Sequence, residues 1–136
     1  MAAVPHMGID GSSEFEEDWF RFKVVRDILE GRLDEALKNL SSRYRVSKPK
    51  LNVGRVKGRS GSAGCYVPRK KTIYAATSNE LRDPRVILHE FYHHLRSSQE
   101  GKSRGAEKYA DKFAMEFIQA YLRIVRGLFR EEVGEG

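Results

Sequence analysis

The sequence is poor in cysteine and has no long apolar run. Its single cysteine, Cys65, excludes an internal disulfide and an all-cysteine metal site, and it fits a reducing cytosol. No apolar stretch approaches the ~18–20 residues that span a bilayer, and no basic segment followed by an apolar one opens the chain. We therefore expect a cytoplasmic protein without a membrane partner.

The chain also lacks internal repeats and low-complexity segments, and its 136 residues suit one domain. A hydrophobic fraction of 40% is enough for one modest core. Residues 1–13 are interpreted as a cloning remnant, which Met1 to Met7 resembles, followed by a disordered N-terminus. Residues 14–130 are expected to form the domain, and residues 131–136 a flexible acidic tail.

Acidic residues are missing from one long segment. Ser41 to Asn79 holds ten basic residues and no acidic one, whereas Asp10 to Glu35 holds nine acidic and four basic residues. The basic stretch fits either an anionic partner, such as a nucleic acid, or the solvated side of a sheet. We favour the solvated sheet, because the stretch matches no nucleic-acid motif.

Periodicity predicts helices at both ends of the domain. Ser13 and Glu16 form a capping box that predicts the start of the first helix, and Asp83-Pro84 is a strong start signal for the third. The predicted helices run from Ser13 to Leu29 before Gly31, from Leu33 to the break at Pro49, from Pro84 to about Ser97, and from about Gly105 to Phe129.

Three short segments rich in Val, Ile and Tyr lie between these helices. They are predicted to be strands joined by hairpin-length turns: Leu51–Lys57, Ala63–Val67 and Lys71–Ala76. The whole pattern predicts an α+β fold. In it, a small three-stranded sheet packs on the N-terminal helices, on the helix that begins at Pro84 and on a long C-terminal helix.

His89-Glu90-Phe91-Tyr92-His93 is an HExxH motif inside the third predicted helix. Histidines four residues apart lie one turn from each other on one face, so both imidazoles can reach one ion. The glutamate beside the first histidine is then placed to contact a metal-held water rather than the ion. We predict one Zn²⁺ per chain on His89 and His93, with Glu90 as general base.

The opposite face of this helix is apolar, which predicts that it packs in the core while the histidines face away. The apolar residues are Pro84, Ile87, Leu88, Phe91 and Leu95. His94 lies about 100° from His93 around the helix, and we interpret it as an incidental histidine rather than a ligand.

A catalytic zinc needs a third protein ligand and an open fourth position. Cys65 is one candidate, but its place within a strand predicts a core residue. Glu107 and Asp111 lie one turn apart on the apolar stripe of the fourth helix, where burying unpaired carboxylates is costly. We predict Glu107 as the third ligand and Asp111 as a carboxylate that supports a ligand.

The alternative reading is that both carboxylates complement the dipole of the helix N-terminus, which suits Glu107 better than Asp111. The short connection favours the metal site. It makes the two helices antiparallel and brings His93 level with Glu107.

With these residues the chain resembles the gluzincin zinc metallopeptidases, whose HExxH is followed on a second helix by ExxxD or ExxA. Here that second element is Glu107-Lys108-Tyr109-Ala110-Asp111. Size and layout are most similar to the minigluzincins, over roughly Leu51 to Leu128. The resemblance implies a zincin-like domain that hydrolyses peptide bonds of a polypeptide substrate, and an edge strand, Lys71 to Ala76, that pairs with it.

The chain departs from the larger gluzincins in having only residues 94–106 between His93 and Glu107 and no downstream subdomain. The residue that stabilises the oxyanion is therefore unassigned, with Tyr66, Tyr92 and Tyr109 as candidates. Two other functions stay open: a nucleic-acid-associated zinc protein, and a zinc scaffold without turnover. The oligomeric state is open too.

The acidic end of the chain suggests a latent form. Glu131, Glu132 and Glu135 are good zinc ligands, and six extended residues span about 20 Å, so the tail is a candidate to enter the cleft and displace the water. We favour the alternative, a solvated, disordered end.

Overall fold

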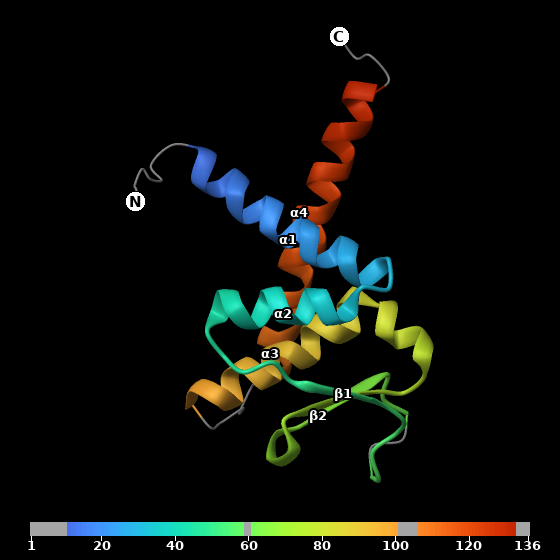
Figure 1. Cartoon of the computed structure of the whole chain (residues 1–136). Coiled ribbons are helices and arrows are strands. Elements are labelled where there is room, and N and C mark those ends of the chain that lie inside the picture. Colours follow the sequence, from blue (N-terminus) through green and yellow to red (C-terminus); the bar gives the residue numbers. More distant parts are fainter. Residues whose placement is uncertain (1–10, 59–60, 101–105, 133–136) are drawn as a thin grey trace.

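A computed structural model describes residues 11–58, 61–100 and 106–132 (Figure 1). The elements in these residues are α1 (Gly11–Leu29), α2 (Leu33–Tyr44), β1 (Lys50–Val53), β2 (Gly64–Val67), β3 (Thr72–Ala75), α3 (Pro84–Glu100) and α4 (Ala106–Glu132). The predicted α+β fold is confirmed. Within the described residues, no helix has the length and apolarity needed to cross a membrane.

The sheet has β3 at its centre. β2 pairs with β3 in the antiparallel sense, as the predicted hairpin, whereas β1 pairs with the other side of β3 in parallel. The register places Leu51 of β1 beside Ile73 of β3. The prediction that Lys71–Ala76 forms an edge strand is therefore wrong, because the long segment between β1 and β2 lets β1 cross to the far side of β3.

Several helix ends differ from the predicted ones. α1 begins at Gly11, so Ser13 lies inside its first turn rather than capping it. Gly31, with φ of +84°, makes the expected turn after α1. α2 ends at Tyr44, well before Pro49, because Arg45 adopts a left-handed conformation that turns its N–H back to the helix carbonyls.

The third helix begins as predicted. The Asp83 carboxylate accepts a hydrogen bond of 3.0 Å from the backbone N–H of Arg85, and Pro84 opens α3. α3 continues three residues past Ser97. α4 continues to Glu132, three residues past the predicted end at Phe129, while residues 133–136 of the predicted tail lie outside the described part.

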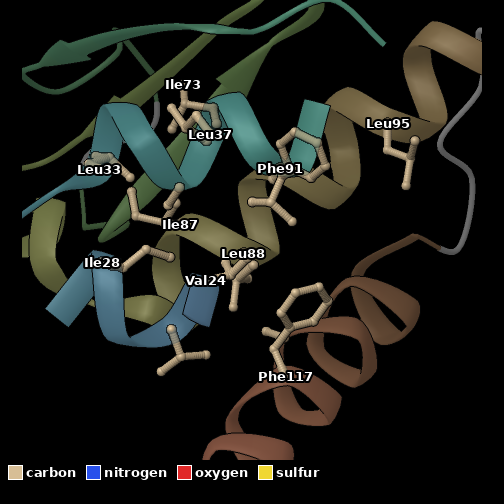
Figure 2. Packing of buried hydrophobic residues seen from close by; sticks show 14 of the residues in the cluster. Val24, Ile28, Leu33, Leu37, Ile73, Ile87, Leu88, Phe91, Leu95 and Phe117 are labelled. Carbon is tan, nitrogen blue, oxygen red and sulfur yellow. The ribbon is translucent and has the colours of Figure 1, made fainter. Parts of the chain in front are cut away.

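The hydrophobic core gathers side chains from α1, α2, β3, α3 and α4 around the apolar face of α3 (Figure 2). Its labelled members are Val24, Ile28, Leu33, Leu37, Ile73, Ile87, Leu88, Phe91, Leu95 and Phe117. Ile87, Leu88, Phe91 and Leu95 are buried, as predicted. Their burial fixes the rotation of α3, and so sets the direction in which His89 and His93 point.

The buried face of α4 is rotated from the apolar stripe that the sequence predicts, which comprises Ala110, Ala114, Ile118, Tyr121, Leu122 and Val125. Ala110, Ala114 and Phe117 are fully buried, whereas Leu122 and Val125 are exposed. The shift arises because the tilted rings of Phe113 and Phe117, with centroids 5.0 Å apart, pack against each other and into the core. The expectation that Glu107 and Asp111 are buried is therefore wrong: their side chains are 78% and 57% exposed.

Candidate metal centre

Three ligand atoms meet where α3 passes the first turn of α4. The Nε2 atoms of His89 and His93 are 3.3 Å apart, and each lies 2.9 Å from a carboxylate oxygen of Glu107. A tetrahedral ion with bonds of 2.0–2.1 Å spaces its ligands about 3.3 Å apart. The three atoms lie within 4.8 Å of one another, so this cluster could hold a metal ion.

Asp111 contacts the opposite side of the first histidine. Its Oδ1 lies 2.8 Å from Nδ1 of His89, so the Nδ1–H donates to the carboxylate. This contact fixes the tautomer and directs the Nε2 lone pair of His89 toward His93 and Glu107. Asp111 therefore lies where a carboxylate that supports a metal ligand must lie.

The cluster is open on one side. The side chains of His89 and His93 on α3 are only 16% and 13% exposed, whereas the Glu107 side chain on α4 is 78% exposed. An ion bound here would contact the two imidazoles on one side and would be accessible to solvent on the other.

A groove of about 410 Å³ runs from the cluster to the start of β2. Its lining residues are Ser62, Ala63, Gly64, Arg85, Val86, His89, Glu90, Glu107 and Asp111. β2 pairs only with β3 among the described strands, so its other edge is unpaired, and its first residue, Gly64, lines the groove. The edge strand beside the cluster is therefore β2, and not the segment 71–76.

Glu90 is buried, with 7% exposure, yet it lines the groove. Gly64 makes room for it: a Cβ at Gly64 would lie 3.3 Å from Oε2 of Glu90 and 2.7 Å from Cγ1 of Val86. Sequence reasoning missed Gly64. The available signal was the run of small residues from Gly61 to Gly64, directly before a strand.

Replacing Gly64 with alanine should lower the free energy of unfolding by about 1–3 kcal/mol, since the added methyl overlaps Val86 and the Glu90 side chain must shift. Gly127→Ala is the matched control. It lies in α4 with nothing within 4 Å of an added Cβ, so it should be neutral or stabilising by up to about 1 kcal/mol. Urea unfolding measures both, and equal stability of Gly64→Ala and wild type would contradict the packing.

His94 is a core residue and not an incidental one. It is fully buried, its Nε2–H donates to the carbonyl of Ser47 at 2.7 Å, and its Nδ1 accepts from the Tyr66 hydroxyl at 2.7 Å. Burial lowers the pKa of His94, and burial raises the pKa of Tyr66, so the first stays neutral and the second stays a donor. The Tyr66 hydroxyl is thus engaged away from the cluster.

The remaining predicted residues fall in different places. Cys65 is buried in β2 and is not part of the cluster, in line with a core residue. Tyr92 packs its ring on Phe113, and Tyr109 is exposed.

The acidic end of the chain is carried away from the cluster. α4 is continuous from Ala106 to Glu132, so Glu132 lies about 38 Å along the helix from Glu107 (Figure 1). Residues 133–136 span at most about 14 Å when extended. Glu131 and Glu132 of the proposed inhibitory tail are therefore too far along α4 to reach the cluster, and Glu135 lies outside the described residues.

Comparisons of the chain with protein-family models, with curated proteins and with solved structures found no match.

Proposed function

We propose that the protein is a zinc metallopeptidase of the gluzincin type. The observation that carries the proposal is the convergence of His89, His93 and Glu107 on one point, with Glu90 in the same groove and a free strand edge beside it. A structural metal site has no need of the last two features.

Two imidazoles and a carboxylate are a donor set that suits zinc, and three protein ligands leave one coordination position for water or substrate. Zinc held there would lower the pKa of a bound water toward ~7 and polarise the carbonyl of a scissile peptide. This is the chemistry that peptide hydrolysis needs at neutral pH.

The remaining roles belong to side chains of this chain. Asp111 orients His89 through the contact to Nδ1. Glu90 takes the proton of the attacking water and passes it to the leaving amine. The packing of Glu90 against Gly64 holds its carboxylate in the groove, which suits a base that must act at one place.

The strand edge supplies a way to hold the substrate. The outer edge of β2 has backbone N–H and C=O groups that can pair with an extended peptide as an added strand. Ser62, Ala63 and Gly64 are small, so a peptide main chain can pass close to His89. An unfolded or extended polypeptide is therefore the proposed substrate class.

Removal of zinc with a chelator should abolish cleavage of unfolded casein, and one equivalent of zinc per chain should restore it. Because the core does not involve the cluster, far-ultraviolet circular dichroism of the metal-free protein should match that of the loaded protein. Cleavage that persists without metal would contradict the proposal. No cleavage by the fully loaded protein would favour a zinc scaffold without turnover.

A further inference from the structure

The groove carries one basic side chain. Among its lining residues, all the charged groups other than Arg85 belong to the metal cluster, to Asp111 or to Glu90. Arg85 lies in the first turn of α3, four residues before His89, so the two residues share one side of the helix a turn apart. Arg85 therefore lines the groove one helical turn from His89.

This guanidinium is not neutralised by the protein. Within the part of the chain that the structure describes, its side chain has no ion pair and no hydrogen bond. Arg32 and Arg123, in contrast, are paired with Asp27 and Asp18. Arg85 thus has five N–H donors without an acceptor among the described residues, and such a group suits a ligand that brings a carboxylate.

The carboxylates of the groove do not compete with such a ligand for Arg85. Glu107 and Asp111 contact the two nitrogens of His89, and Glu90 is buried against Gly64. An anion that approaches Arg85 from solvent therefore meets carboxylates that are already engaged.

The far end of β2 is also basic. The turn from β2 to β3 exposes Arg69, Lys70 and Lys71, just beyond a strand that rises about 10 Å from Gly64 to Val67. An extended peptide on the β2 edge would thus lie between Arg85 at one end and this turn at the other. The basic residues of this turn would therefore favour an acidic peptide over a basic one.

We propose that the groove selects peptides with a carboxylate next to the scissile bond, and that Arg85 binds this carboxylate. The inference rests on the proposed peptidase function and names the substrate class of the same site. Aspartate or glutamate side chains and the carboxylate at a peptide C-terminus offer the same chemistry, and the experiment separates them.

The test uses the zinc-loaded full chain with Glu90→Gln, which does not consume the probe. Fluorescein-labelled peptides of one sequence carry glutamate, glutamine or lysine at the central position, each as a C-terminal amide. A fourth peptide has the glutamine centre and a free C-terminal carboxylate. We expect the best carboxylate peptide to bind about 3- to 10-fold more tightly than the neutral peptide by anisotropy.

Adding Arg85→Gln to the Glu90→Gln protein should abolish this preference. Adding Arg85→Glu instead should shift the preference toward the lysine peptide. Arg82→Gln is the matched control, because Arg82 lies in the preceding turn and lines a different pocket. It should keep the preference. Raising the salt concentration should weaken the preference in the parent protein.

Equal binding of the charged and neutral peptides, or a preference that survives Arg85→Gln, would overturn the inference. Tighter binding of a single-stranded oligonucleotide than of the acidic peptide would overturn it as well. The wild-type protein is assayed for cleavage of the same peptides. Cleavage without a charge preference would contradict only the role of Arg85. Arg85-dependent binding without any cleavage would contradict only the proposed peptidase function.

Discussion

Zinc should be lost from the Glu107→Ala protein while the fold is kept. The Glu107 side chain is 78% exposed and contacts the two histidines, so its removal opens no cavity in the core. It does remove one of three ligand atoms and leaves two imidazoles that no longer enclose an ion. The expected fall in zinc affinity exceeds the ~10–100-fold typical of losing a residue that only supports a ligand.

The loss of zinc affinity in the Asp111→Ala protein is the reference against which the loss in Glu107→Ala is compared. Asp111 touches His89 at Nδ1 and offers no atom to the cluster, so its loss should weaken zinc binding by roughly 10–100-fold. Glu116→Ala removes another carboxylate of α4, far from the histidines, and should bind zinc as wild type does. Competition titration with a zinc indicator ranks the three variants. A larger loss at Asp111 than at Glu107 would mean that their roles are exchanged.

Peptidase activity should be lost from the Glu90→Gln protein while zinc is kept. Glutamine matches glutamate in shape, so it should fit the space beside Gly64, but it cannot accept the proton of the attacking water. Removal of a general base is expected to slow cleavage by about 10²- to 10⁴-fold.

The control for this variant is Glu116→Gln, which makes the same chemical change on the surface of α4. Casein cleavage and zinc content are measured on the same samples. Wild-type cleavage by Glu90→Gln would remove Glu90 from the mechanism. Loss of zinc from the same variant would make Glu90 a ligand instead of a base.

The sequence predicted the parts of the molecule that depend on local chemistry. The apolar face of α3 and the cap at Asp83 follow from residues within a few turns of each other, and both are present. The HExxH and ExxxD residues also predicted which side chains would meet, because a short connection leaves two helices few ways to pack.

The missed features depend on residues far apart in the chain. Nothing within β1 specifies a parallel pairing with β3, so the residues of the strands alone do not identify the edge strand. The rotation of α4 follows from two aromatic rings that find space only in the assembled core. The roles of Gly64 and Arg85 depend on the packing of β2 beside α3.

The most direct test of this account is a crystal structure of the zinc-loaded protein with the zinc located by its anomalous signal. We predict one zinc site per chain, about 2.0–2.2 Å from Nε2 of His89, Nε2 of His93 and a carboxylate oxygen of Glu107. Its fourth position should face the groove beside Glu90. Zinc bound elsewhere, or a fourth protein ligand that closes the site, would contradict a catalytic zinc.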